Sequence, residues 1–173
     1  MGRILLPGNA SGGMRSVTSG YTGDMTARTH GHHPLPSWQD PDALRMMLGE
    51  CHTWAVVGLG DNPARTAFGV ARFLQARGKR IVPIHPSAAT VLGEPGYASL
   101  ADVPFPVDVV DVFRRSEEAG VFADQAVEVG ARGVWFQLGV VDPAAFERAV
   151  AAGVPMVMDT CPVIEWPRVA ESA

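Results

Sequence analysis

Cysteine and lysine are scarce in this 173-residue sequence, and long apolar runs are absent. Its two cysteines, Cys51 and Cys161, are too few for a disulfide framework, so we expect a reduced, cytoplasmic protein. No apolar run approaches the roughly 18 residues of a membrane span, and the first residues lack the apolar stretch of a secretory signal. We therefore expect neither secretion nor a membrane partner.

Acidic residues are missing from residues 62–93, which carry five basic side chains, although the whole chain has a net charge of −4 at pH 7. Residues 37–173 hold 11 basic and 17 acidic residues. An acidic protein with one basic segment is poorly suited to general nucleic-acid binding, but it can hold a polyanionic small molecule. We expect no nucleic-acid partner.

Residues 1–36 show no apolar periodicity, and Gly, Pro, Ser and Thr occupy 17 of these 36 positions. This composition predicts a disordered tail before a domain at residues 37–173. His30, His32 and His33 lie in the tail. Imidazoles bind zinc and similar ions, but an ordered site needs partners that fix the rings. We interpret these histidines as part of a polar stretch and predict no metal site.

Strand-like and helix-like patterns alternate after residue 37. Helical patterns are bounded by residues such as Asp40-Pro41, Gly78, Asp142-Pro143 and Gly153. The expected strands are five apolar runs, at 54–59, 81–84, 107–113, 134–137 and 156–159. Such alternation is typical of an α/β fold. We predict a Rossmann-like doubly wound parallel sheet of about five strands, in the order 3-2-1-4-5, with helices on both faces.

In such a sheet, ligands bind outside the carboxyl ends of the strands. The loop after the first strand contains Gly58, Gly60, Asp61, Asn62 and Pro63. Glycines let the backbone approach a ligand, and N–H groups at the start of the next helix attract phosphate. The third glycine of a dinucleotide-binding G-x-G-x-x-G motif is replaced by Pro63. We expect a phosphate here, with a purely structural turn as the alternative.

The loops after the second and third strands are candidates for binding the rest of a nucleotide. The second strand leads into His85 and Pro86, without the acid that would hold the ribose of NAD, whereas NADP stays open. Phe113 offers a flat surface to an adenine or a pantetheine-like arm. Arg114 and Arg115 can each pair with a phosphate; otherwise they are exposed charges before a helix.

Several segments resemble the small bacterial CoA-binding proteins, which are similar to the CoA-binding domain of the succinyl-CoA synthetase α chain. The resemblance covers about residues 40–168, and its most specific motifs are Phe113-Arg114-Arg115 and Trp135-Phe136-Gln137-Leu138-Gly139. It implies CoA with its diphosphate at Gly58–Pro63 and its adenine near the ends of the second and third strands. The pantetheine arm would pass Gln137, Leu138 and Gly139.

This sequence departs from the family pattern at some positions that would face the ligand. Gly60 and His85 stand where the family usually has serine and asparagine, and Ser87, Thr160 and Val163 replace basic residues. The resemblance therefore leaves Arg114 or His85 to hold the 3′-phosphate.

Groups that could act in catalysis are few, and we assign no catalytic residue. Our leading hypothesis is non-catalytic binding of CoA or an acyl-CoA by a sensor, a carrier, a homo-oligomer or the partner subunit of an enzyme. One alternative is an NADP-dependent oxidoreductase, although no Tyr-x-x-x-Lys pair is evident. Another is a redox protein in which Cys161 forms a mixed disulfide with CoA; a small residue packed at a strand end is the simpler interpretation of Cys161.

Overall fold

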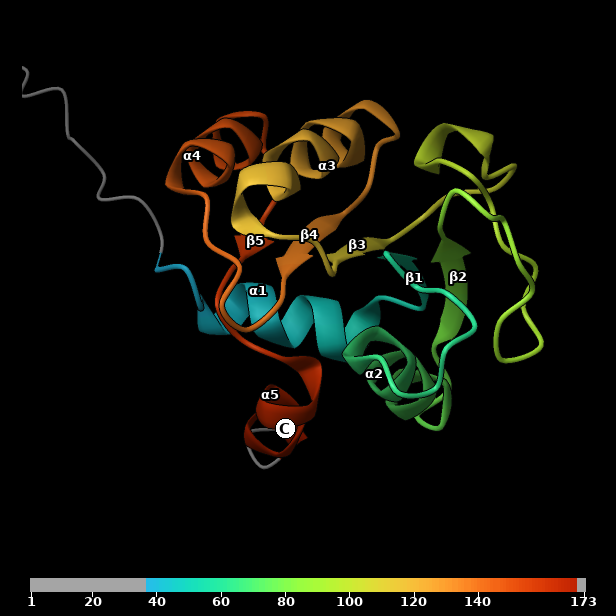
Figure 1. Cartoon of the computed structure of the whole chain (residues 1–173). Helices are drawn as coiled ribbons and strands as arrows, with labels where there is room; N and C mark the ends of the chain where they lie inside the picture. Colours follow the sequence, from blue (N-terminus) through green and yellow to red (C-terminus); the bar gives the residue numbers. More distant parts are fainter. Residues whose placement is uncertain (1–36, 171–173) are drawn as a thin grey trace, which may run out of the picture. The chain divides into compact units, whose positions relative to one another are not determined.

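Five parallel strands form one sheet in the order β2-β1-β3-β4-β5 (Figure 1). The computed structural model describes residues 37–170, so the predictions for residues 1–36 lie outside the described residues. The strands are β1 Thr53–Val57, β2 Arg80–Ile84, β3 Val109–Val112, β4 Gly133–Phe136 and β5 Met156–Val157. The predicted Rossmann-like α/β class with about five strands is confirmed.

The predicted strand order 3-2-1-4-5 is wrong, because β3 lies between β1 and β4 and not beyond β2. Pro83 gives a physical reason for the position of β2, since a strand with a proline suits the edge of a sheet. On the outer side of β2, the Pro83 carbonyl accepts a hydrogen bond from the Tyr97 N–H (2.9 Å), and the His85 N–H donates to the Tyr97 carbonyl (3.0 Å). The short Tyr97 bridge therefore occupies the edge where a third strand was expected.

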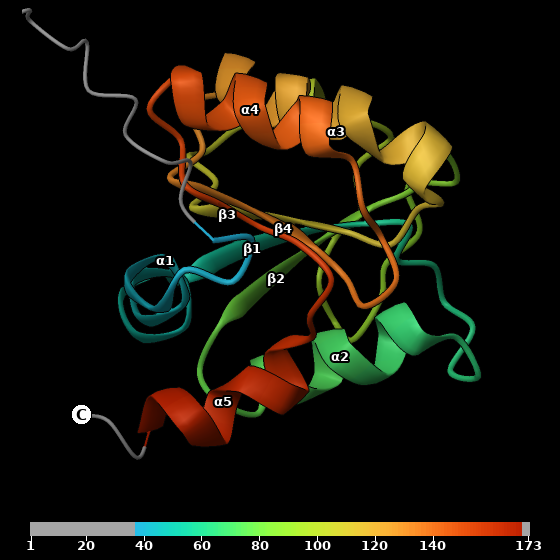
Figure 2. The ribbon, with the colours of Figure 1, turned by 90° about the vertical axis from the view of Figure 1, so that its left-hand side faces the viewer.

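Helices cover both faces of the sheet (Figure 2). α3 and α4 lie on one face, and α1, α2 and α5 lie on the other. The helices are α1 Pro41–Arg45, α2 Thr66–Gln75, α3 Ser116–Glu128, α4 Pro143–Ala151 and α5 Pro162–Ala170, with a π-helical turn at Met46–Glu50 and a 3₁₀ turn at Leu100–Asp102. The predicted starts of α1 and α4 are confirmed, because Asp40 and Asp142 accept hydrogen bonds from backbone N–H groups of the first turns.

Each face of the sheet has its own apolar core. Alternate strand residues point to opposite faces, so Val110 and Val112 pack beneath α3 and α4, whereas Val109 packs on the other face with Trp54 and Trp135. The two tryptophan rings lie 5.8 Å apart between centroids. Asp111 shares the face of Val109, so its carboxyl group lies within an otherwise apolar layer.

Candidate functional site

The strand register places the ends of four strands side by side. Val57 is paired with Ile84 on one side and with Val112 on the other, and Val112 is paired with Phe136. The loops that begin at residues 58, 85, 113 and 137 therefore leave the sheet at one edge. All the candidate site residues named from the sequence belong to these four loops.

Gly58 is the conformationally constrained residue of the first loop. Its φ is +90°, in the region that favours glycine. Its N–H donates to the Ile84 carbonyl (2.8 Å), and a Cβ added at this position would lie 2.8 Å from the Phe113 carbonyl oxygen. Position 58 thus has no room for a side chain, and its backbone joins the ends of β1, β2 and β3.

Gly60 lies against the second loop. A Cβ at position 60 would lie 3.8 Å from both Cδ2 and Nε2 of His85. On the other side of the imidazole ring, Nδ1 accepts the backbone N–H of Ser87 (3.2 Å) and lies 2.8 Å from Ser87 Oγ. His85 therefore keeps Nε2 directed to the glycine loop, while Pro86 is exposed beyond it.

The rest of the first loop leads into α2. Leu59 is buried, whereas Asp61, Asn62 and Pro63 are exposed. Asn62 Oδ1 accepts the N–H of Ala64 (2.9 Å) and so closes a local turn. Arg65, which precedes α2, makes no side-chain hydrogen bond to the helix N-terminus. The first N–H groups of α2 are consequently left without a side-chain cap behind the Gly58–Pro63 loop.

Both arginines after β3 are paired with one carboxylate. Arg114 Nη2 lies 3.0 Å from Glu118 Oε2, and Arg115 Nη2 contacts Glu118 Oε1. The hydrogen bond from Arg115 lowers the pKa of Glu118. These groups are partly or largely exposed, so the ion pairs are weak. A phosphate at this position would have to compete with Glu118 for the arginines.

The fourth loop, at Gln137–Gly139, combines exposed and buried residues. Leu138 and Gly139 are exposed, but Gln137 is buried, and its Nε2 donates to Asp111 Oδ1 over 2.6 Å. The N–H of Gly139 donates to Asp159 Oδ1 (2.8 Å), and the N–H of Val141 donates to Ser116 Oγ (2.9 Å). The β4 loop is thereby fixed by the chain after β5 and by the first residue of α3.

Asp111 is a polar residue of the site region that the sequence analysis missed. It is fully buried, and its Oδ2 has no hydrogen-bond partner among residues 37–170. Burial raises its pKa from 3.8 to about 8, and the hydrogen bond from Gln137 lowers it in part. This shift favours the neutral carboxylic acid form of Asp111 near pH 7. The available signal was an aspartate inside the apolar run 107–113.

Cys161 lies at the same edge, directly before α5. Its side chain is half-buried, and desolvation is the largest cause that raises its pKa. Cys51 is fully buried and, through burial, has a pKa raised to about 11. It lies beside Lys79, whose Nζ donates to the Cys51 carbonyl (2.7 Å) just before the amino end of β2. Lys79 thus lies at the opposite end of the sheet from the four loops.

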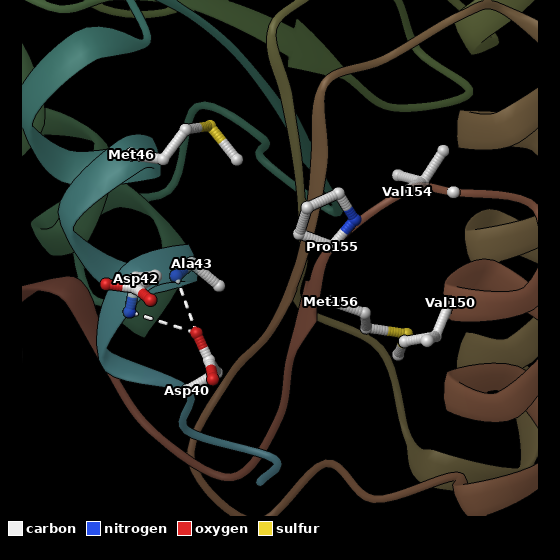
Figure 3. A pocket seen from close by; sticks show the side chains of 9 residues that line it. Asp40, Asp42, Ala43, Met46, Val150, Val154, Pro155 and Met156 are labelled. Carbon is white, nitrogen blue, oxygen red and sulfur yellow. Dashed lines mark hydrogen bonds between the residues drawn. The ribbon is translucent and has the colours of Figure 1, made fainter. Parts of the chain in front are cut away.

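One cavity of the described residues lies away from the four loops. It has a volume of about 510 Å³ and lies between α1 and the chain that leads into β5 (Figure 3). Its lining is mostly apolar, with Ala43, Met46, Val154 and Pro155, and none of the candidate site residues lines it. Its two carboxyl groups already have partners, because Asp40 caps α1 and Asp42 pairs with Arg45. The cavity therefore adds nothing to a phosphate-binding site.

Within residues 37–170, no group of three or more His, Cys, Asp or Glu residues could hold a metal ion. The three histidines of the tail lie outside it. None of the described helices is long and apolar enough to span a membrane.

Comparison with known proteins identifies the family. Residues 52–167 match the CoA binding domain family. An uncharacterised protein of Bacillus subtilis (strain 168), YneT, is 37% identical over 118 residues, which are 68% of this chain and 87% of that protein.

Solved structures with related sequences have a similar fold. A hypothetical protein from Pyrococcus horikoshii OT3 is 30% identical with a TM-score of 0.72, over 78% of this chain and 96% of that one. A Thermus thermophilus structure is 32% identical with a TM-score of 0.69, over 76% and 99%. With its fold, its glycine loop and this match over most of its length, the chain belongs to the CoA binding domain family.

Proposed function

We propose that this protein binds CoA or an acyl-CoA at the carboxyl edge of its sheet, without catalysis of its own. The observation that carries the proposal is the meeting of Gly58, His85 and Phe113 at one edge, in front of the uncapped start of α2. Backbone N–H groups and the helix dipole favour a diphosphate at Gly58–Pro63. A cytoplasmic sensor, carrier or partner subunit would need no more than this site.

The adenine is proposed to lie near the ends of β2 and β3. Phe113 is partly exposed there and offers a flat apolar surface, and His85 and Pro86 border the same loop. Arg114 is the candidate for the 3′-phosphate. It directly follows Phe113 in the chain, and its guanidinium group is only partly engaged by the ion pair with Glu118. A bidentate pair with phosphate is stronger than an exposed pair with a carboxylate.

The pantetheine arm is proposed to pass over Leu138 and Gly139. Leu138 is 63% exposed, and Val163 and Ile164 at the start of α5 are exposed as well. Apolar side chains at the mouth of a polar site suit the alkyl part of the arm. Gln137 would lie beneath the surface over which the arm passes, because it is buried against Asp111.

Calorimetric titration with CoA, dephospho-CoA and NADP tests the proposal. We expect CoA to bind most tightly and dephospho-CoA more weakly, since it lacks the 3′-phosphate. Tighter binding of NADP than of CoA would favour the alternative of an NADP-dependent oxidoreductase and would exclude the proposed ligand.

A further inference from the structure

The Asp111 side chain is joined to the loop after β4 by a buried hydrogen bond. Its register partners are Val56 of β1 and Trp135 of β4, so apolar side chains flank it on both neighbouring strands. Within residues 37–170, its Oδ1 accepts from Gln137 Nε2 (2.6 Å) and its Oδ2 has no partner. A buried carboxyl group with one donor costs stability. Packing alone therefore does not account for an aspartate in this layer.

Gln137 begins a tight turn at the carboxyl edge of the sheet. Its carbonyl accepts the N–H of Val140 (2.8 Å), which closes the turn over Leu138 and Gly139. Leu138 is 63% exposed, and Gly139 has φ +80°. The exposed part of the turn thus directly follows a residue whose side chain is anchored to Asp111 inside the sheet. A displacement of that side chain would be passed to the two exposed residues.

The later part of the loop is held by contacts nearer to solvent. The N–H of Gly139 donates to Asp159 Oδ1, and the N–H of Val141 donates to Ser116 Oγ. The hydrogen bond from Gln137 is fully buried, and in a low dielectric such a bond is stronger than in water. It is therefore the contact that sets where the turn begins.

We propose that Asp111 is a positioning residue of the CoA site: it holds Gln137 and thereby sets the turn that receives the pantetheine arm. The inference rests on the proposed function, because that function places the arm over Leu138 and Gly139. Asp111 is fully buried and acts only through Gln137. Its loss should weaken ligands that carry the arm and spare adenosine 3′,5′-bisphosphate, which lacks it.

The protonation of Asp111 provides a second readout. Burial raises its pKa from 3.8 to about 8, against the hydrogen bond from Gln137. Helices α1 and α2 turn apolar residues to this face. The buried acid of α5, Glu165, has partners of its own, and Lys79 lies at the opposite end of the sheet. Desolvation raises the pKa of Cys161 above 9.0, so its thiol is mostly uncharged up to pH 8.5.

An arm over the turn makes ionisation of Asp111 less favourable. It removes water from that side of the turn, which adds to the cost of a buried charge. By linkage, CoA affinity should fall as pH rises above about 8, and binding should take up protons there. Asp111→Asn keeps an acceptor for Gln137 and does not titrate, so it should lack this fall.

Calorimetric titration of the full chain with CoA and with adenosine 3′,5′-bisphosphate tests the inference. At pH 6.5, Asp111→Val should weaken CoA about three- to tenfold, as expected for a lost hydrogen bond, and leave the bisphosphate unchanged. Asp108→Val is the matched control. Asp108 accepts the N–H groups of His52 (2.8 Å) and Thr53 (2.9 Å) at the opposite end of the sheet, so this variant should keep its CoA affinity.

The pH dependence is compared between the wild type and Asp111→Asn. From pH 6.5 to pH 8.5, the CoA affinity of the wild type relative to that of the variant should fall about two- to fourfold. The titrating groups of CoA are common to both proteins and cancel in this ratio. Asparagine is nearly isosteric with aspartate, so this comparison decides the matter if urea unfolding shows that Asp111→Val does not fold.

Four results would overturn the inference: full CoA affinity in Asp111→Val, an equal loss for CoA and the bisphosphate, the same loss in Asp108→Val, or identical pH profiles for the wild type and Asp111→Asn. If the wild type binds CoA and one of these results appears, only the positioning role fails. If the wild type does not bind CoA at pH 6.5, the proposed function itself fails.

Discussion

A Cβ atom on Gly58 would lie 2.8 Å from the carbonyl oxygen of Phe113, closer than Cβ atoms approach other atoms in proteins. The end of β1 and the end of β3 are therefore in direct backbone contact. Since Gly58 also has φ +90°, this contact requires glycine for two separate reasons. The loop proposed for the diphosphate depends on it.

Gly58→Ala should destabilise the fold by about 1–3 kcal/mol and abolish CoA binding, because strain and the clash with Phe113 both displace the loop. Urea unfolding and calorimetry measure the two effects. Gly60→Ala is the matched control: its Cβ would meet the His85 ring at an ordinary 3.8 Å. It should keep stability while weakening CoA binding. Full CoA affinity in Gly58→Ala would contradict the role of this loop.

Asp111→Asn should change how stability depends on pH. The pKa of Asp111 is raised from 3.8 to about 8, so between these values the folded state holds one more proton than the unfolded state. Its contribution to the free energy of unfolding then falls as pH rises, by up to about 1.4 kcal/mol per pH unit, and is constant above about pH 8. Asparagine does not titrate, so the free energy of unfolding of Asp111→Asn lacks this decrease with pH.

Urea unfolding from pH 5 to pH 9 checks this expectation. The wild-type and Asp111→Asn curves should diverge up to about pH 8 and run parallel above it. Curves that stay parallel throughout would mean that Asp111 is not held neutral in the folded protein.

The Gln137–Asp111 hydrogen bond can be measured with a double-mutant cycle. Gln137→Leu leaves both oxygens of a buried carboxyl group unpartnered and should cost about 1–3 kcal/mol of stability. Adding Asp111→Leu removes that group, so the double variant should be more stable than the sum of the single effects predicts, with a coupling of about 0.5–3 kcal/mol. Strict additivity would show that the two side chains do not depend on each other.

Glu118→Gln should release Arg114 and Arg115 for a phosphate. We expect CoA to bind about two- to fivefold more tightly, because a competing carboxylate is lost, with a steeper dependence on salt. Stability should change little, since the ion pairs are exposed. Calorimetry at two salt concentrations measures the affinity, and weaker binding would assign Glu118 a role in holding the ligand.

Arg114→Ala and His85→Ala separate two parts of the ligand. If Arg114 holds the 3′-phosphate, Arg114→Ala should remove the preference for CoA over dephospho-CoA. His85→Ala should instead weaken both ligands equally, because His85 faces Gly60 in the diphosphate loop. Calorimetric titration of each variant with CoA and with dephospho-CoA distinguishes the two roles. The reverse pattern would assign the 3′-phosphate to His85.

The sequence was sufficient to predict the element boundaries wherever local chemistry decides them. Asp40 and Asp142 cap helices as expected, and the apolar runs form the five strands within a few residues. The strand order was not predictable in this way, because it depends on long-range pairing. Pro83 indicated an edge position for β2, since its missing N–H suits an edge strand. The expected order nevertheless placed β2 between two neighbouring strands.

Helix α5 and Asp111 escaped the sequence analysis for different reasons. Pro167 inside α5 argues locally against a helix, yet packing of Trp166 and Val169 on the α2 face overrides it. Asp111 looked like one residue of a strand, and only the fold shows that it points into a core. The loops of the candidate site were found because parallel strands send their ends to one edge.

The position of CoA is tested most directly by following backbone amide resonances during a titration with CoA. We predict that the largest shifts occur at Gly58, Gly60, the start of α2 and Gly139, with little change at Met46 and Val154. Shifts concentrated around the apolar cavity near Met46 and Val154, with the Gly58–Pro63 loop unchanged, would contradict binding at the carboxyl edge of the sheet.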